Sequence, residues 1–245
     1  MNICIISGAS SGIGKAIANE VDPLGFDEIW LIGRNECRLK ETKKNLKSNT
    51  RIFALDLCSE DSYSALEKEL LSGEYAVGAL VLCAGIGYTG TLEENTHAKI
   101  ASMVDTNCKS LTLLINTALP YIPRGGKIIN LASGAGFLPQ ADFAVYAATK
   151  SYVISLSMAL SKELKQKGIT VCAVCPGPVD TEFFAGLENV KERKKKYLIS
   201  PQRVAKGAVK AAWRGKKLYV PTVSMKLLHI ASKLLPTSLL LKFSK

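Results

Sequence analysis

The stretch NICIISGASSGIGKA, residues 2–16, decides the fold of the chain. Its first six residues form an apolar run that predicts a buried strand. Gly8, Gly12 and Gly14 follow directly, and a helical pattern begins among them. Glycines at such a turn let the backbone bend tightly and let a phosphate approach the free N–H groups of a helix N-terminus. The stretch therefore predicts a strand–turn–helix unit with a dinucleotide site at the turn.

The rest of the chain continues this alternation of apolar strands and helical stretches. Continuous apolar strands indicate burial on both faces, as in a parallel sheet with helices on each side. We therefore expect a single α/β domain over residues 1–245, a three-layer doubly wound parallel sheet of the Rossmann type. The further predicted strands are 28–33, 51–57, 77–85, 125–133 and 168–177, and the main predicted helices are 12–25, 96–121 and 146–167.

The pattern changes after the sixth predicted strand. Residues 178–200 form a long irregular segment, which we expect to be a substrate lid containing short helices. Residues 200–213 predict another helix, because Ser200 is a favoured N-cap and Pro201 is favoured at the first helical position. Residues 216–221 then predict a last strand.

The composition excludes several classes of protein. No apolar window of about 18 residues is free of charge and proline, so we expect no membrane-spanning helix. The first residues lack the basic start and cleavage site of a signal peptide, which favours a cytoplasmic protein with its seven cysteines as thiols. Cys172 and Cys175 have a metal-like spacing, but on a predicted strand they face opposite sides. We therefore predict no metal site.

The formal net charge of +11 indicates a preference for anionic partners. Much of it comes from KERKKK, residues 191–196, and from the C-terminal third of the chain. No aromatic-interleaved motif accompanies these lysines, so we expect no nucleic-acid partner. Two interpretations stay open, a solvated helix face and the attraction of a phosphorylated or membrane-bound substrate.

The end of the second predicted strand indicates which cofactor is preferred. An NAD-binding site places a carboxylate there to hold the ribose 2′-hydroxyl. This chain instead has Gly33, Arg34 and Asn35. The planar guanidinium of arginine suits a 2′-phosphate, which favours NADP(H) over NAD(H). The alternative is that Arg34 is an ordinary surface residue.

These residues together resemble the short-chain dehydrogenase/reductase (SDR) family over nearly the whole chain. SGASSGIG is similar to the T-G-x-x-x-G-x-G turn of the family, with serine in place of threonine. DTNCKS supplies Asn107, INLASGAG supplies Ser133, and YAATK supplies Tyr146 and Lys150. Ser133 precedes Tyr146 by thirteen residues, as the family pattern requires.

Two further segments extend the resemblance, and one departs from it. PGPVDT, residues 176–181, resembles the segment that contacts the nicotinamide, and Asp56 in LDL resembles the acidic residue near the adenine. The N-N-A-G motif of the family appears here as LCAG, residues 82–85. Ala84 and Gly85 can still line the cofactor with backbone. The missing amides put local sheet hydrogen bonds in doubt, but not the chemistry.

The resemblance implies a full set of site residues. The catalytic set is Asn107, Ser133, Tyr146 and Lys150. The cofactor-binding set also includes Asn107, Tyr146 and Lys150, and its other members are Gly8, Ser10, Ser11, Gly12, Ile13, Gly14, Arg34, Asn35, Asp56, Leu57, Cys83, Ala84, Gly85, Pro176, Gly177, Val179 and Thr181.

The chemistry of these residues favours carbonyl reduction and its reverse. Tyrosine has an unperturbed pKa of about 10, and we expect the Lys150 cation on the same helix face to lower the pKa of Tyr146. Tyr146 would donate a proton to the carbonyl oxygen while Ser133 stabilises that oxygen. By resemblance, Lys150 also bonds the nicotinamide ribose and Asn107 anchors a water. Each residue alone could instead be an ordinary helix or turn residue.

The C-terminal segment, about residues 222–245, has an amphipathic pattern. Leu227, Leu228, Ala231, Leu234 and Leu235 are predicted to share one side of a helix. Packing on the core or on a second subunit and an interfacial anchor with lysines toward phospholipid are both compatible with this pattern. Lys226, His229 and Lys233 are predicted to lie on the opposite side of this helix.

We therefore expect an NADP(H)-dependent oxidoreductase that interconverts a ketone or aldehyde and an alcohol by hydride transfer. FLPQADF, residues 137–143, and EFFAGL, residues 182–187, favour an apolar substrate. The family resemblance implies a homodimer or homotetramer. The alternatives are a non-catalytic NADP(H)-binding sensor and a membrane-surface interaction protein. The complete Ser133, Tyr146 and Lys150 set argues against the sensor.

Overall fold

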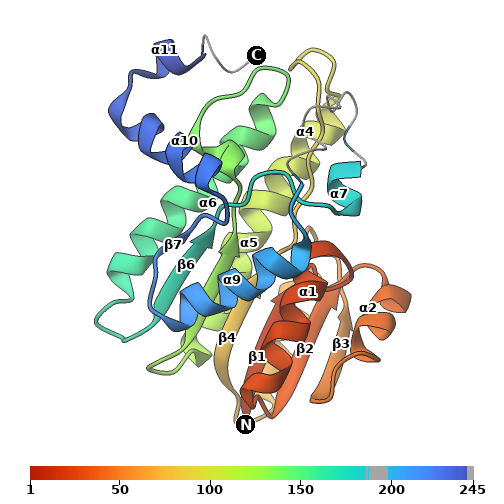
Figure 1. The fold of residues 1–245 in the computed structure, drawn as a ribbon. Helices are drawn as coiled ribbons and strands as arrows, with labels where there is room; N and C mark the ends of the chain where they lie inside the picture. Colours follow the sequence, from red (N-terminus) through yellow and green to blue (C-terminus); the bar gives the residue numbers. More distant parts are fainter. Residues whose placement is uncertain (186, 188–197, 242–245) are drawn as a thin grey trace.

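The computed structural model describes residues 1–185, 187 and 198–241 (Figure 1). Seven parallel strands form one sheet with helices on both faces, which confirms the predicted doubly wound fold. The strands are β1 (Asn2–Ser7), β2 (Glu28–Gly33), β3 (Asn49–Ala54), β4 (Ala76–Leu82), β5 (Lys127–Leu131), β6 (Thr170–Val174) and β7 (Leu218–Tyr219). The main helices are α1 (Gly12–Val21), α2 (Glu36–Lys43), α3 (Asp61–Leu71), α4 (His97–Val104), α5 (Ser110–Ala118), α6 (Ala144–Glu163), α7 (Glu182–Ala185), α9 (Pro201–Trp213), α10 (Val223–Leu234) and α11 (Thr237–Leu241).

The strand order is β3-β2-β1-β4-β5-β6-β7. The order reverses direction at β1, which pairs with β2 on one side and with β4 on the other. In open parallel sheets, ligands bind at such a switch point, outside the carboxyl ends of the strands. The fold therefore places a binding site at the upper edge of the sheet in Figure 1, where β1 leads into α1.

Two apolar cores cover the two faces of the sheet. Strands β1 and β2 contribute to both, because successive side chains point to opposite faces. Helices α1, α2 and α9 supply residues to one core, and α3, α5 and α6 supply residues to the other. Cys172 and Cys175 lie in different cores, which confirms that they face opposite sides of the sheet. All seven cysteines lie in the described part of the chain and are free thiols.

Several boundaries differ from the sequence-based expectation. The third strand ends at Ala54, three residues before the predicted end at Leu57, so LDL lies in a turn. The predicted helix 96–121 is interrupted by one π-helical turn at Asp105–Lys109. The helix predicted at 146–167 begins two residues earlier, at Ala144, and ends at Glu163. Helix α9 begins as predicted, with Ser200 accepting a hydrogen bond from the Arg203 N–H at 3.3 Å.

Helices α2 and α3 were missing from the prediction, for different reasons. Only Leu39 and Thr42 of α2 are buried, so this charged helix has almost no apolar periodicity. In α3, Tyr63, Leu66 and Leu70 do have helical spacing on one face, so its signal was present in the sequence.

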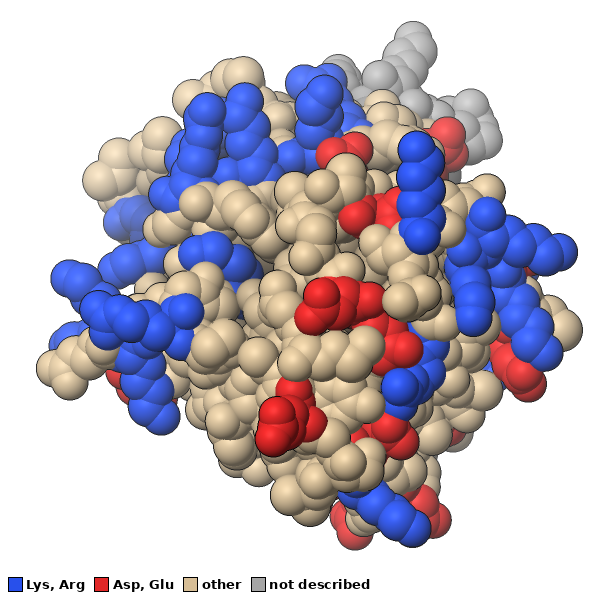
Figure 2. All heavy atoms as spheres, turned by 90° about the horizontal axis from the view of Figure 1, so that it is seen from below, with Lys and Arg blue, Asp and Glu red and all other residues tan. Residues whose placement is uncertain are grey.

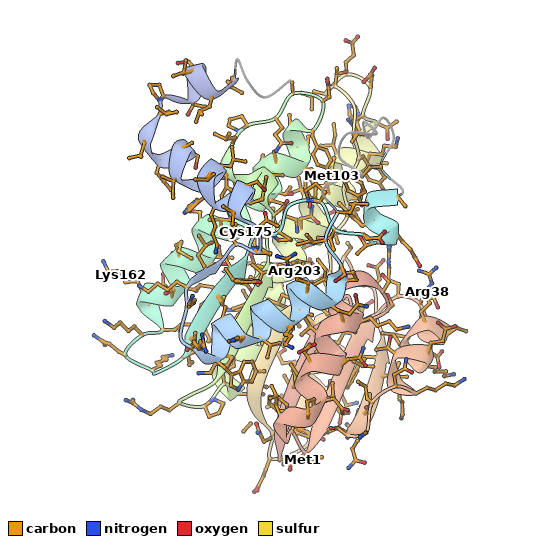
Figure 3. All side chains as sticks on the ribbon, viewed as in Figure 1. Met1, Arg38, Met103, Lys162, Cys175 and Arg203 are labelled. Atoms are coloured by element: carbon orange, nitrogen blue, oxygen red, sulfur yellow. The ribbon has the colours of Figure 1, made fainter. Side chains whose placement is uncertain are left out.

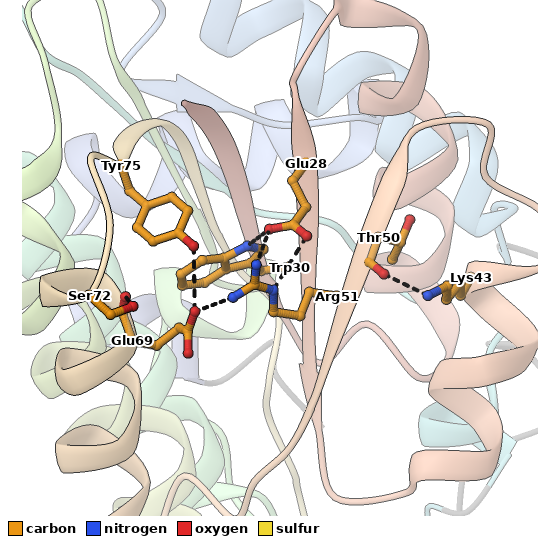
Figure 4. A network of polar contacts seen from close by, with 8 residues as sticks. All are labelled: Glu28, Trp30, Lys43, Thr50, Arg51, Glu69, Ser72 and Tyr75. Carbon is orange, nitrogen blue, oxygen red and sulfur yellow. Dashed lines mark hydrogen bonds and ion pairs between the residues drawn. The ribbon is translucent and has the colours of Figure 1, made fainter.

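A polar network fixes the end of the sheet opposite the site (Figure 4). The Arg51 guanidinium forms ion pairs with Glu28, at 3.2 Å, and with Glu69. It lies 5.3 Å from the ring centroid of Trp30, whose indole N–H donates to Glu28 at 2.5 Å. The network joins β2, β3 and α3 and gives the fully buried indole a hydrogen-bond partner.

Seen from below, Lys and Arg lie mainly around the margin of the surface and Asp and Glu nearer its middle (Figure 2).

Candidate active site at the carboxyl edge of the sheet

Apart from Asn107, Tyr146 and Lys150, the predicted site residues lie beyond the carboxyl ends of six strands, with Asp56 and Leu57 following β3. Those of the glycine turn follow β1, Arg34 and Asn35 follow β2, and residues 83–85 follow β4. Ser133 follows β5, and residues 176–181 follow β6. Because carboxyl ends of parallel strands share one edge of a sheet, segments far apart in sequence meet there.

The glycine turn is closely packed against the neighbouring strand end. Gly8 has a φ of +67°, and a Cβ there would lie 2.6 Å from the backbone nitrogen of Ala84. A Cβ on Gly14 would lie 2.2 Å from the carbonyl oxygen of Gly8. Only glycine fits either position without moving the backbone. Ser11 is the N-cap of α1 but its side chain makes no capping bond, so no Ser11 side-chain oxygen occupies the first N–H groups of the helix.

Ser7 holds the LCAG segment beside this turn. The Cys83 N–H donates to the Ser7 carbonyl at 3.1 Å, and the Ala84 N–H lies 3.4 Å from the Ser7 hydroxyl oxygen. Leu82 itself is the last residue of β4. The segment is therefore held by backbone and by Ser7, although both family asparagines are absent. Ile13 packs against the core on the α1 side.

A groove of about 760 Å³ extends from the turn toward α2. The Asn35 side chain accepts from the Arg38 N–H at 3.0 Å and so caps α2, which leaves its amide less free for a ligand. Glu36 also lines the groove, but its carboxylate is paired with Lys40 at 2.7 Å. The complete lining is Ser10, Ser11, Arg34, Asn35, Glu36, Cys37 and Arg38.

Arg38 links this groove to the lid. Its guanidinium forms a 2.6 Å ion pair with Glu182 on α7, and Figure 3 shows Arg38 between α2 and α7. A second hollow of about 460 Å³, lined by Gly12, Thr181 and Glu182 among others, lies on the other side of the turn. The two hollows flank the N-terminus of α1, where a pyrophosphate would be favoured.

Asp56 and Leu57 occupy different environments. Asp56 is exposed and accepts from the Cys58 N–H at 3.0 Å, so its carboxylate stabilises the turn after β3. The Leu57 side chain is buried in the core and does not line either hollow. Leu57 could therefore contact a cofactor through its backbone only.

The segment after β6 closes the far side of the site. Pro176 accepts from the Gly134 N–H at 2.8 Å, which ties this segment to the loop that carries Ser133. Val179 is buried and pairs with Ile199, so both ends of the predicted lid are held together. The middle of the predicted lid, including KERKKK at 191–196, lies outside the described residues.

Tyr146 lies in the first turn of α6 and is almost fully buried. The Ser133 side chain lies near its phenol and acts to lower the phenol pKa. Burial raises the pKa of Tyr146 to about 12, and the Ser133 side chain opposes this only in part. The expectation of a lowered pKa is wrong for the protein alone, because desolvation outweighs the effect of the Ser133 side chain.

Lys150 lies one turn further along α6 and is also buried. Its Nζ donates to the Leu131 carbonyl at 2.9 Å and lies 5.7 Å from the centroid of the Tyr146 ring. Burial lowers the pKa of Lys150 to about 8, with the nearby thiols of Cys83, Cys108 and Cys175 acting in the opposite direction. Lys150 therefore remains a cation at neutral pH, but only by a small margin.

Asn107 lies in the π-helical turn between α4 and α5. Its side-chain oxygen accepts from the Ile86 N–H at 2.9 Å, and its amide donates to the Ile86 carbonyl at 2.8 Å and to Thr149 at 3.0 Å. The side chain thus joins the β4 loop to α6 between Tyr146 and Lys150. A water anchored by Asn107 remains a prediction.

Apolar side chains that the sequence did not assign individually surround Tyr146. The Phe143 ring stacks on the phenol with centroids 4.3 Å apart, and Phe183 of α7 lies at 5.6 Å. Both belong to the segments flagged as apolar in the sequence. Met225 of α10 packs over Gly134 and Gly177, beside Ser133, and no local motif signals this long-range contact.

The arrangement fits a nicotinamide dinucleotide. The crowded glycines, the uncapped N-terminus of α1 and the long groove toward α2 provide a cradle for a pyrophosphate and its adenosine half. The described residues contain no group of His, Cys, Asp or Glu able to hold a metal ion. They also contain no helix long and apolar enough to cross a membrane.

The fold and this edge define a dinucleotide-binding α/β protein, and comparison with known proteins gives the family. A family model for short chain dehydrogenases matches residues 2–192. An uncharacterised oxidoreductase of Staphylococcus epidermidis is 31% identical over 226 residues, covering 91% of this chain and 96% of the relative. The chain therefore belongs to the short chain dehydrogenase family of oxidoreductases.

Solved structures with the same fold bind either form of the cofactor. A short-chain dehydrogenase from Sphingobium yanoikuyae in complex with NADPH has a TM-score of 0.81 and 25% identity, covering 95% of this chain and 94% of its own. A short-chain dehydrogenase/reductase from Burkholderia phymatum in complex with NAD has a TM-score of 0.81 at 22% identity, with coverages of 95% and 94%. A nicotinamide dinucleotide cofactor is therefore supported for the family fold.

The Lys150 pKa predicts how activity depends on pH. If Tyr146 is a proton donor, the ammonium would stabilise negative charge on the phenol, and this stabilisation would be lost as pH rises through about 8. We expect kcat/KM for carbonyl reduction to be level below this pH and to fall about tenfold per unit above it. Tyr146 itself stays protonated throughout, because its pKa is about 12.

A Lys150→Arg variant is the matched control for this pH profile. Arginine stays charged over the whole range, so the residual activity of the variant should lose the alkaline fall. An alkaline fall of equal size in both proteins would contradict the assignment to Lys150.

Proposed function

We propose that the protein is an NADP(H)-dependent oxidoreductase that interconverts an apolar ketone or aldehyde and the corresponding alcohol. The observation that carries this proposal is that the Ser133 side chain and the Lys150 ammonium both lie beside the buried Tyr146 phenol, with Lys150 Nζ 5.7 Å from the ring centroid. The same residues stand in the positions of the family's catalytic set. We also propose a cytoplasmic homodimer or homotetramer, as the family resemblance implies.

The bound cofactor would supply or accept the hydride. In the reductive direction, Tyr146 donates its phenolic proton to the carbonyl oxygen, and the Ser133 hydroxyl donates a hydrogen bond to the same oxygen. Lys150 offsets the charge left on the phenolate. Asn107 bonds both Thr149 and the loop after β4, which holds the turn of α6 between Tyr146 and Lys150 against that loop.

The preference for NADP(H) is supported by charge at the adenosine end of the groove. Arg34 and Arg38 line it, with Arg38 paired to Glu182, and its one carboxylate, Glu36, is engaged by Lys40. A 2′-phosphate gains from a guanidinium donor, while a ribose 2′-hydroxyl finds no free carboxylate among the groove residues.

Substitution of Arg34 tests this preference. We expect Arg34→Ala to weaken NADPH binding by about tenfold to a hundredfold, because a charged hydrogen-bond donor to the phosphate is lost, and to leave NADH binding nearly unchanged. Lys44→Ala is the control, since it removes one cation at the far end of α2. Equal loss for NADPH and NADH in Arg34→Ala would show that Arg34 does not read the phosphate.

The apolar substrate is supported by Phe143 and Phe183 beside the phenol and by Met225 beside Ser133. NADPH turnover on a panel of quinones, diketones, steroids and acyl ketones tests this class. The alternative, a sensor that binds NADP(H) without turnover, gains support if NADPH binds tightly and no ketone is reduced.

A further inference from the structure

Helix α10 has an inner face that is anchored beside the active site. Met225 packs over Gly134, where a Cβ would lie 2.7 Å from its sulfur. The His229 ring lies 4.5 Å from the Phe137 ring, centroid to centroid. These contacts hold α10 against the short helix Gly134–Phe137, which directly follows Ser133. The position of α10 is therefore set by the loop of the catalytic serine.

The outer face of α10 carries an exposed apolar stripe. Val223, Leu227, Ile230 and Leu234 are 70%, 63%, 52% and 76% exposed. Their spacing of four, three and four residues places them along one side of the helix. Figure 1 shows α10 and α11 on the outer margin of the molecule, projecting beyond the sheet and its covering helices.

The exposed and buried sides of α10 differ from the apolar and polar sides predicted from the sequence. Leu228 and Ala231 are partly buried, whereas Leu227 and Leu234, with which they were grouped, are exposed. His229 is also partly buried, whereas Lys226 and Lys233 are exposed next to the stripe. The exposed surface thus combines large aliphatic side chains with lysines, and the inner surface holds α10 to the protein.

The charge of the chain is concentrated in the same region of the sequence. Residues 193–245 contain 14 of the 32 Lys and Arg and none of the 21 Asp and Glu. The net charge of +11 therefore arises from this segment, and the rest of the chain is slightly acidic. The segment begins where the match to the family model ends, at residue 192.

An anionic lipid surface satisfies both properties of this face. Aliphatic side chains of an interfacial helix insert at the boundary of the acyl chains, while lysines reach the headgroups. Anionic headgroups also attract a cationic segment that has no acidic residues to oppose them. A second copy of this chain docked on the same face would instead bring two copies of this cationic segment together, which is unfavourable. We propose that the outer face of α10, continued by exposed Leu239 of α11, docks on a bilayer that contains anionic phospholipid.

Co-sedimentation of the full chain with vesicles tests this docking, and the test is independent of any enzymatic activity. The vesicles are phosphatidylcholine alone or phosphatidylcholine with about one quarter phosphatidylserine. We expect binding to the anionic vesicles, weakened by salt, and a loss of at least about tenfold in Leu227→Ser/Ile230→Ser/Leu234→Ser. Lys226→Gln/Lys233→Gln should weaken binding to the anionic vesicles as well.

The matched control is Leu71→Ser/Leu92→Ser, which removes two leucines that are 72% and 63% exposed elsewhere on the surface. This control should bind as the unchanged chain does, and thermal unfolding checks that all variants are folded. Failure of the unchanged chain to sediment with anionic vesicles would overturn the proposal, as would equal sedimentation of the α10 leucine variant. Equal binding to neutral vesicles would overturn the anionic requirement. A dimer that the leucine variant dissociates, without vesicle binding, would assign the face to self-association instead.

Discussion

Replacing Tyr146 by phenylalanine is expected to lower kcat for carbonyl reduction by about 10²- to 10⁴-fold, the usual contribution of a general acid. The variant removes one oxygen atom from a buried side chain and keeps the ring between Phe143 and Phe183. NADPH affinity should therefore change by less than about twofold, because the lost proton matters in the transition state more than in binding. Steady-state kinetics and a binding titration measure the two quantities separately.

Tyr152→Phe is the control for this prediction. Tyr152 lies on the same helix, is 42% exposed, and shares a 2.8 Å hydrogen bond with Thr112 on the surface. This variant should keep nearly full activity. If Tyr146→Phe retains most of its kcat, or if both variants lose the same activity, Tyr146 is not the proton donor.

Replacing Gly14 by alanine is expected to be the most damaging single methyl addition in the cofactor cradle. The new Cβ would lie 2.2 Å from the Gly8 carbonyl oxygen, and both partners are backbone, so the start of α1 must move away from β1. Crowding of this kind costs about 1–3 kcal/mol of unfolding free energy. The shifted N–H groups should also lower NADPH affinity by more than about tenfold. Urea denaturation and a cofactor titration give both values.

Gly33→Ala is the control for this prediction, because it adds a methyl group near the site without crowding the backbone. Its Cβ would meet Leu39 and Ser10 at 3.5 Å, which is ordinary van der Waals contact. The variant should therefore keep its stability and most of its NADPH affinity. Gly14→Ala with the stability and cofactor affinity of the unchanged chain would contradict the close approach at this turn.

Much of the fold could be predicted from the sequence because its signals are local. The strands are continuous apolar runs, and Ser200 and Pro201 mark the start of α9. The glycine turn indicated the candidate site, since the positions that need glycine are close together in the chain. The same local signals missed α2, whose few buried residues leave no periodicity, and the π-helical turn that carries Asn107.

The pKa shifts of Tyr146 and Lys150 and the packing of α10 beside the site could not be predicted, because both depend on the tertiary structure. The sequence places a lysine four residues from Tyr146, but it does not reveal that desolvation raises the phenol pKa and lowers that of Lys150. Met225 reaches Gly134 from a helix more than ninety positions away. The helical pattern of α10 gave its amphipathic character, but only the packed structure shows which side is exposed.

The measurement that tests the central claim most directly is NADPH oxidation by the purified chain against the ketone panel, beside Tyr146→Phe. We predict NADPH-dependent turnover of at least one apolar ketone, with that turnover lost in the variant. Tight NADPH binding with no turnover of any ketone, or turnover that survives in Tyr146→Phe, would contradict the proposed reductase.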